Sequence, residues 1–186
     1  MLKHIGTLTI ETERLNLRRF KLSDADAMFK NYTNSEKVCE FLTWQPHEKI
    51  ENTIEYLEYI LPLYEKLSTY RWAIELKETG EVIGAIDVID SLDDKRRCEL
   101  GWVLGDKYWG KGYMPEAAKA VIKYLFDVGY LRVQAIHDVA NPKSGRVMEK
   151  AGMTYEGILK KYELNNKDEL TDCAIWAIIK EGVFNV

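Results

Sequence analysis

The sequence contains few cysteines and histidines, and their spacing argues against several kinds of site. The three cysteines are odd in number and widely separated, and none lies in a Cys-x-x-Cys pair: Cys39, Cys98 and Cys173. This pattern indicates neither a disulfide framework nor a zinc ribbon. The three histidines are equally scattered, without metal-ligand spacing: His4, His47 and His137. We therefore expect no metal site.

Long apolar runs and an excess of basic residues are also missing. No stretch approaches the ~18 consecutive apolar residues of a membrane span, and residues 1–7 lack the apolar core of a signal peptide. The formal net charge of -4 provides no general basic field for nucleic acid. With its free thiols, the chain is expected to be cytoplasmic and to bind neither membranes nor nucleic acid. An acidic surface is compatible with a cationic substrate such as an amine.

What is present fits one domain, 1–186. The 186 residues are 46% hydrophobic and 30% charged, which is enough for one core and too little for two comfortable domains. No internal repeat, low-complexity tract or linker divides the chain. The oligomeric state expected is a monomer or a homodimer, the latter through an exposed terminal hairpin.

Apolar periodicity and turn residues predict a mixture of strands and helices. Pro62 is expected to kink or shorten the helix that contains it. In chain order the predicted elements are a strand over 15–20, helices over 23–32 and 50–64, strands over 70–76, 82–89 and 98–104, a helix over 115–129, a strand over 131–139, a helix over 142–152, and a hairpin of strands 153–164 and 170–179. This order indicates an α+β fold, with a mixed sheet covered by helices.

A glycine pair, Gly110 and Gly112, precedes the helix predicted over 115–129. Glycine permits positive φ and a close approach of the backbone to a ligand. The helix N-terminus offers unpaired N–H groups that suit a phosphate. Taken alone, a tight turn into a helix is the simpler interpretation. The chain lacks a Gly-x-x-x-x-Gly-Lys-Ser/Thr motif, and Pro115 stands where a dinucleotide fingerprint has its third glycine, so neither nucleotide motif is indicated.

Three motifs in order give this loop its context. They are Glu-Leu-Gly-Trp-Val-Leu over 99–104, Trp-Gly-Lys-Gly-Tyr over 109–113, and Asn-x-x-Ser-x-x-Val-x-Glu-Lys-x-Gly-Met over 141–153. With Glu-Arg-Leu-x-Leu-Arg over 13–18, they resemble the GNAT superfamily of N-acetyltransferases. The closest resemblance is to the branch that acetylates the N-terminal alanine or serine of ribosomal proteins. The chain departs from the family pattern at Met114, where Gly or Ala is usual, and at Met153, where Phe is usual.

The resemblance implies a three-layer α/β/α fold around a mixed, mostly antiparallel sheet of about six to seven strands that splits at an acyl-CoA cleft. It implies acetyl-CoA as co-substrate, with its pyrophosphate on the loop 110–114 and its pantetheine arm along 102–104 like an added strand. The residues expected to contact it are Trp102, Val103, Leu104, Trp109, Gly110, Lys111, Gly112, Tyr113, Met114, Asn141 and Ser144.

The implied reaction is direct attack of an amine on the thioester, without a covalent enzyme intermediate. Glu99 is the candidate base, acting directly or through water; the alternative is an exposed strand glutamate paired with Arg96 or Arg97. Ser144 is the candidate donor to the departing thiolate; the alternative is a first-turn residue that helps to cap its helix. His137 is expected to be structural rather than a base.

The acceptor side is less well defined by the sequence. Glu40, Trp44, Tyr70 and Trp72 are candidate acceptor-binding residues, with at least one of them expected in the core. The acceptor is a protein N-terminus or a small amine such as a polyamine, amino sugar or amino acid. The loop around Trp44 and the turn 165–167 decide between an open groove and a closed pocket. Two other classes are a non-catalytic acyl-CoA sensor and a module for other nucleotides.

Overall fold

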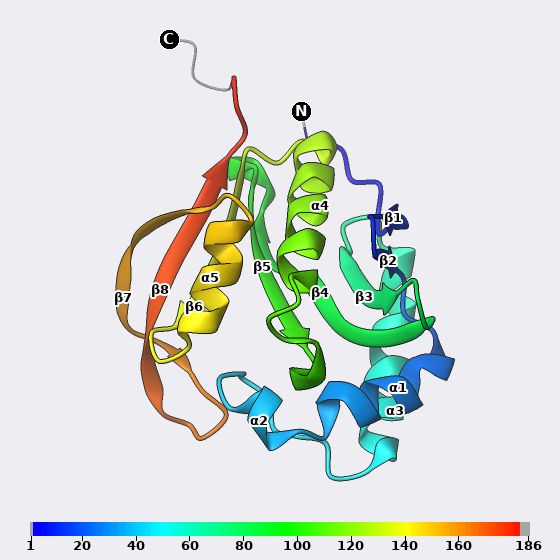
Figure 1. Cartoon of the computed structure of the whole chain (residues 1–186). Coiled ribbons are helices and arrows are strands. Elements are labelled where there is room, and N and C mark those ends of the chain that lie inside the picture. The colour runs from blue at the N-terminus through cyan, green and yellow to red at the C-terminus, as the bar shows by residue number, and fades with distance from the viewer. Residues whose placement is uncertain (1, 183–186) are drawn as a thin grey trace.

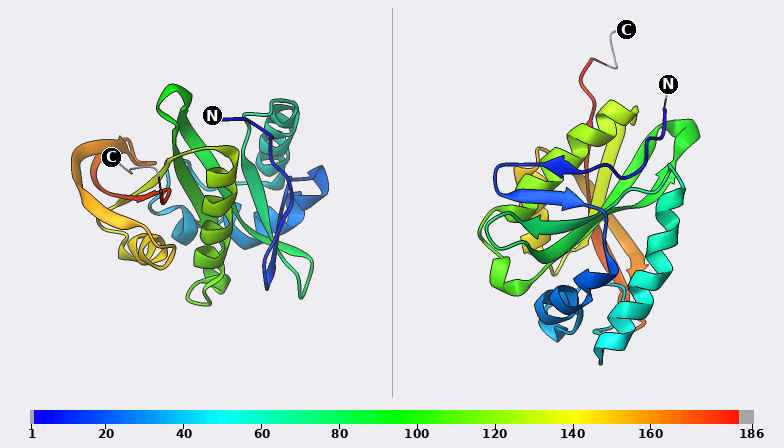
Figure 2. Two further views of the ribbon diagram at one scale, coloured as in Figure 1. Left: turned by 90° about the horizontal axis from the view of Figure 1, so that it is seen from above. Right: turned by 90° about the vertical axis from the view of Figure 1, so that its right-hand side faces the viewer.

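The computed structural model describes residues 2–182, which form one eight-stranded sheet with helices on both faces (Figures 1 and 2). The strand order is β1-β2-β3-β4-β5-β6-β8-β7. Only the β5–β6 pair is parallel, and every other pair is antiparallel. The strands are β1 (Ile10–Glu11), β2 (Leu15–Arg18), β3 (Arg71–Leu76), β4 (Glu81–Leu92), β5 (Arg97–Leu104), β6 (Arg132–Asp138), β7 (Thr154–Leu164) and β8 (Leu170–Ile179).

Five α-helices cover the sheet among the described residues. They are α1 (Ala25–Met28), α2 (Glu36–Cys39), α3 (Ile50–Ile60), α4 (Tyr113–Val128) and α5 (Pro142–Lys150). One apolar core lies between the sheet and the pair α4 and α5, and a second lies between the opposite face and the pair α1 and α3. Figure 2 shows the sheet between these two layers. The predicted mixed α/β architecture is therefore confirmed.

Two details differ from or refine the expected pattern. The sheet has eight strands rather than six or seven, because the two-residue β1 pairs with β2 and is too short to show an alternation. The helix that contains Pro62 ends as α3 at Ile60 and continues only as a 3-10 turn, Leu61–Glu65. Proline removes one donor of the α-helical ladder, so this shortening follows the expectation.

The sheet divides in its middle, between the two parallel strands. Strands β5 and β6 pair only from Arg97–Glu99 to Arg132–Gln134. Beyond Glu99, β5 continues beside β4 to Leu104, whereas β6 continues beside β8. The second half of β5 therefore has one edge free of a neighbouring strand, and its backbone groups there are available to a ligand.

Within residues 2–182, no helix combines the length and apolarity that crossing a membrane requires.

Candidate functional site

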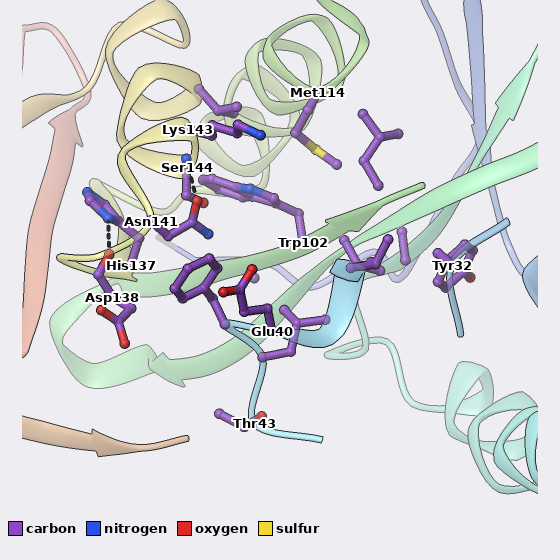
Figure 3. Close-up of a pocket in the computed structure, with 18 of the residues that line it drawn as sticks. Tyr32, Glu40, Thr43, Trp102, Met114, His137, Asp138, Asn141, Lys143 and Ser144 are labelled. Atoms are coloured by element: carbon purple, nitrogen blue, oxygen red, sulfur yellow. Dashed lines mark hydrogen bonds between the residues drawn. The ribbon is translucent and has the colours of Figure 1, made fainter. Parts of the chain in front are cut away.

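One groove of about 1080 Å³ joins the free edge of β5, the N-termini of α4 and α5, and the loop that follows α2. A typical small-molecule site measures ~300–1,000 Å³. The groove is therefore large enough for an extended ligand and a second reactant. Figure 3 shows its centre, where Trp102 of β5 lies between Ser144 of α5 and Glu40 at the end of α2.

The glycine loop forms the α4 end of the groove. Gly110 has φ +76° and Gly112 has φ +83°, values that side chains rarely adopt, and no atom lies within 4 Å of where a Cβ of Gly110 would be. Gly112 is the N-cap residue of the 16-residue helix α4. Gly112, Tyr113 and Met114 line the groove, and their backbone N–H groups have no partner within the α-helix. Met114 is only 3% exposed; its side chain packs in the core and also lines the groove (Figure 3).

Side chains from the turn between β1 and β2 form hydrogen bonds with this loop and with the first turn of α4. The guanidinium of Arg14 donates to the carbonyl of Lys111 at 2.9 Å and to the carboxylate of Glu116 at 2.7 Å. Glu116 also accepts from Thr12 Oγ1 at 2.6 Å. Arg14 belongs to the motif over 13–18, and its contact with Lys111 gives a physical reason for that motif to occur together with the motif over 109–113. The side chain of Lys111 does not line the groove, because its Nζ lies over the ring of Tyr108, 5.6 Å from the centroid.

Trp109 forms a wall between the loop and β5. Its indole N–H donates to the carbonyl of Leu104 at 2.7 Å, which ties the loop to the end of the strand. Lys143 Nζ lies over the same ring, 4.6 Å from its centroid. Trp102, Val103 and Leu104 all line the groove along the free edge of β5, as expected from the sequence.

Three basic side chains of α5 line the groove, although the sequence analysis did not name them as site residues. Lys143, Arg146 and Lys150 are spaced by three and four residues and therefore share one face of the helix. This spacing was visible in the sequence as a helical stripe of positive charge. It places cations beside the glycine loop, where they complement a phosphorylated ligand.

Ser144 and Asn141 lie together at the start of α5 (Figure 3). The Asn141 side chain caps the helix by accepting from the Ser144 backbone N–H at 3.4 Å. Within residues 2–182 the Ser144 hydroxyl has no hydrogen-bond partner, and it lines the groove opposite Trp102. Its side chain is therefore available as a donor to a ligand.

Glu99 lies on β5 before the point at which β5 and β6 part. Its carboxylate is buried and accepts from the Gln134 amide at 2.7 Å. Burial raises the pKa of Glu99, an effect that the Gln134 hydrogen bond opposes. It is not among the residues that line the groove. Its role as a base stays a prediction.

His137 lines the groove but has both ring nitrogens engaged. Its Nε2 accepts from the Trp176 indole at 3.2 Å, so the ring proton is on Nδ1, which donates to the Asp138 carbonyl at 2.8 Å (Figure 3). These two hydrogen bonds agree with the expectation of a structural, hydrogen-bonded histidine. Cys98 is also buried in the core, on the face of α4 and α5.

Two of the four candidate acceptor-binding residues line the groove, and two do not. Glu40 and Trp44 are at its α2 end. Tyr70 and Trp72 do not line the groove, since they are 2% and 0% exposed and belong to the core under α4; at least one of the four candidates was expected there. Strand alternation turns Trp72 away from the groove, so its ring meets Tyr124 edge-on at 5.4 Å.

The groove contains an acidic group that the sequence analysis missed, Asp87 of β4. Its Oδ2 lies 3.3 Å from Arg71 Nε, while its Oδ1 is buried without a hydrogen-bond partner. The hydroxyl of Tyr32, in the same groove, is likewise buried and unpartnered. Burial raises the pKa of Asp87 to about 6, although Arg71 and the backbone N–H of Trp72 oppose this shift. In the sequence, Asp87 could have been found as the one acidic residue inside the apolar run of β4.

The turn of the β7–β8 hairpin lies near the loop that follows α2 (Figure 1). The Asn166 amide donates to the carbonyls of Cys39 at 2.8 Å and Trp44 at 3.3 Å. Its backbone N–H donates to the carbonyl of Leu42 at 3.2 Å. The loop after α2 and the hairpin therefore enclose this part of the groove.

Comparisons with known proteins agree with this geometry. A family model described as an acetyltransferase (GNAT) domain matches residues 14–154. The chain is 31% identical over 172 residues to the uncharacterized N-acetyltransferase YoaA of Bacillus subtilis (strain 168), covering 92% of this chain and 96% of that protein. It is 37% identical over 168 residues to the ribosomal protein uS5-alanine N-acetyltransferase of Escherichia coli (strain K12), covering 87% and 86%. The structure of a GNAT-family acetyltransferase from Bacillus anthracis superposes with a TM-score of 0.79 at 29% identity, covering 92% and 98%.

Proposed function

The chain belongs to the GNAT family of acetyltransferases, and on this premise we propose that it transfers the acetyl group of acetyl-CoA to a primary amine. The observation that carries this proposal is the continuity of the groove. It joins a helix N-terminus with two positive-φ glycines to the free edge of β5 and then to an enclosed acidic end. This sequence of surfaces suits a diphosphate, an extended amide-containing arm and a cationic acceptor, in that order.

The residues of the groove fit acetyl-CoA segment by segment. The loop at Gly110 and Gly112 holds the pyrophosphate through backbone N–H groups, and Lys143 and Arg146 add positive charge. The free edge of β5 pairs with the amides of pantetheine, and a backbone N–H there polarises the thioester carbonyl.

In the proposed reaction the amine nitrogen bonds directly to the acetyl carbonyl carbon, and the carbon–sulfur bond breaks. The starting ammonium loses one proton to a protein carboxylate and a second to the departing sulfur. The products are the acetylated amine, CoA thiol and one released proton. Ser144 donates a hydrogen bond to the sulfur as negative charge develops on it. The base is one of two carboxylates on the same face, Glu99 or Asp87.

We propose a protein α-amino group as the acceptor. A relative at 37% identity is a ribosomal protein uS5-alanine N-acetyltransferase. An α-amino group has a pKa of ~7.7–8.0 against ~10.4 for lysine, so it demands less of a base.

A specific feature favours a second acceptor class, a small amine. The bridge from Asn166 to the carbonyls of Cys39 and Trp44 encloses the acceptor end. An enclosed pocket suits a polyamine, amino sugar or amino acid better than a polypeptide.

Calorimetric titration with acetyl-CoA, with ATP and NAD as controls, tests the donor. We expect selective binding in the micromolar range. Turnover is then compared between peptides that begin with alanine or serine and a panel of small amines. Absence of acetyl-CoA binding, or a preference for ATP or NAD, contradicts the proposed function, and binding without turnover on any amine indicates a sensor.

The basic stripe of α5 predicts a salt-dependent affinity. We expect Lys143→Gln to weaken acetyl-CoA binding roughly threefold to tenfold at low ionic strength, because one charge-assisted contact is lost. The difference should shrink at ~1 M salt, where the Debye length is ~3 Å. Lys123→Gln, an exposed lysine on α4 outside the groove, is the matched control and should bind as the wild type does. Equal affinities of both variants at low salt would contradict the role of Lys143.

A further inference from the structure

The acceptor end of the groove holds two buried polar atoms without partners, Asp87 Oδ1 and Tyr32 Oη. Buried polar atoms in folded proteins are nearly always hydrogen-bonded, so each exception calls for an explanation. The two atoms come from different elements, β4 and the π-helical segment Phe29–Thr33, yet line the same groove. A ligand that donates hydrogen bonds in this part of the groove would supply the missing partners of both.

Asp87 also lies in register with the free edge of β5. Arg71, Asp87 and Gly101 are directly opposite one another on β3, β4 and β5. Because opposite residues share a face of the sheet, Asp87 lies on the same face as Gly101. The side chain of Ile89 fills the space next to Gly101, 2.9 Å from where a Cβ would be. Neighbouring strands are ~4.8 Å apart, so Asp87 lies one strand away from the edge assigned to the thioester.

We propose that Asp87 and Tyr32 form the seat of the acceptor's amino group, with Asp87 as the base that takes its proton. The inference rests on the proposed acetyl transfer and adds to it the identity of the base and the charge of the acceptor, a primary ammonium ion.

Arg71 orients the carboxylate for this role. Arg71 Nε holds Asp87 Oδ2 at 3.3 Å, and Arg71 Nη1 donates to the Tyr56 hydroxyl at 2.8 Å. Oδ2 is thus held by Arg71, whereas Oδ1 is buried and has no hydrogen-bond partner until a ligand supplies one. The arrangement keeps a negative charge in the groove without filling the place of the amine.

The titratable groups that face Asp87 leave it as the proton acceptor near neutral pH. Arg71 on β3 stays charged. Burial raises the pKa of Tyr32, of Tyr56 on α3 and of Tyr64 in the turn after α3, so all three hydroxyls remain neutral. Burial also raises the pKa of Asp87 to about 6, so it is ionised above that pH and protonated below it. A base with this pKa suits an α-amino acceptor.

The proton and electron changes balance. The ammonium N–H proton passes to Asp87 Oδ1, and its electron pair stays on nitrogen. That pair forms the bond to the acetyl carbon, while the Tyr32 oxygen accepts a hydrogen bond from a second N–H. The carbon–sulfur bond breaks with its electron pair on sulfur, which takes the second nitrogen proton and leaves as CoA thiol. The Asp87 proton leaves to solvent after the product departs, which restores the carboxylate.

The test compares Asp87→Asn with the wild type as a function of pH, using an alanine-initiated peptide or the best small amine. The ratio of wild-type to variant kcat/KM for the amine cancels the acceptor's own titration. We expect a ratio of at least about tenfold at pH 8 that falls toward one as the pH drops through about 6, where Asp87 in the wild type becomes neutral. Acetyl-CoA affinity should be unchanged. Asp90→Asn, an exposed carboxylate on the same strand, is the matched control and should match the wild type.

Tyr32→Phe provides a second, independent test that does not require Asp87→Asn to fold. It removes a hydroxyl that has no partner, so the fold should be retained, and we expect the acceptor KM to rise at least threefold with acetyl-CoA affinity constant. A pH-independent ratio near one for Asp87→Asn, or an unchanged acceptor KM for Tyr32→Phe, overturns the seat. Loss of the pH dependence in Glu99→Gln instead would assign the base to Glu99. Failure of the wild type to bind acetyl-CoA is a different result, since it removes the proposed function itself.

Discussion

Gly112→Asp is expected to abolish acetyl-CoA binding. Gly112 is the N-cap residue of α4, at the mouth of the groove. An aspartate there places a carboxylate against the pyrophosphate and competes for the same helix N–H groups. Two like charges ~4 Å apart repel by about 4 kcal/mol at an effective dielectric constant of ~20, which corresponds to about a 1000-fold weaker Kd. Calorimetric titration of the variant measures this loss directly.

Gly112→Asn is the matched control for this charge. Asparagine has nearly the same shape and, like aspartate, tolerates the positive φ of +83° at this position. Both variants should show the same small fall in Tm, but only aspartate should remove binding. Arg14 Nη2 lies 3.3 Å from where the new Cβ would be, and its pairing with Glu116 limits its ability to neutralise an added carboxylate. An aspartate variant that binds as tightly as the asparagine variant would refute the phosphate assignment of the loop.

Ser144→Ala is expected to lower kcat by about 100-fold. A single hydrogen-bond donor aimed at developing charge is typically worth ~10²–10³ in rate. The Ser144 hydroxyl lines the groove and has no partner within the described residues, so its removal leaves no buried group unsatisfied. The Asn141 cap accepts from the Ser144 backbone and not from its side chain, so α5 should persist. Steady-state kinetics should give an unchanged KM for acetyl-CoA.

Ser144→Thr separates the chemistry from the structural role. Threonine retains the hydroxyl at the first turn of α5, and we expect it to recover most of the lost kcat. If alanine and threonine were equally slow, packing at the helix start would be the cause. If alanine kept full activity, the departing thiolate would need no donor from this residue.

The fold and the cofactor side of the groove could be predicted from the sequence because their signals are local. Gly110 and Gly112 precede a helix within a few residues, and Asn141 with Pro142 marks the start of another. The free edge of β5 was expected only through the family resemblance, and the pairing that stops at Glu99 agrees with it. The basic stripe of α5 could have been found from its helical spacing.

The acceptor side could not be predicted in the same way. Trp72 lies on β3, close to the strands that form the groove. Strand alternation nevertheless turns its side chain into the core under α4. Asp87 is the one acid within the apolar run 82–89 of β4, and nothing local indicates that it pairs with Arg71. Asn166 meets the loop after α2 across more than 120 residues of chain.

The sequence by itself determined the α+β class, the glycine turn that precedes a helix, and the family, since each depends on residues within a few positions of one another. The tertiary structure alone decided which carboxylates line the groove, which aromatic residues are core, and how the hairpin turn meets the loop after α2. The physical reason is that a strand turns its side chains to alternate faces, so a shift of one position moves a residue from the groove to the core. Partners on other strands and loops then set its charge and its hydrogen bonds, as Arg71 does for Asp87.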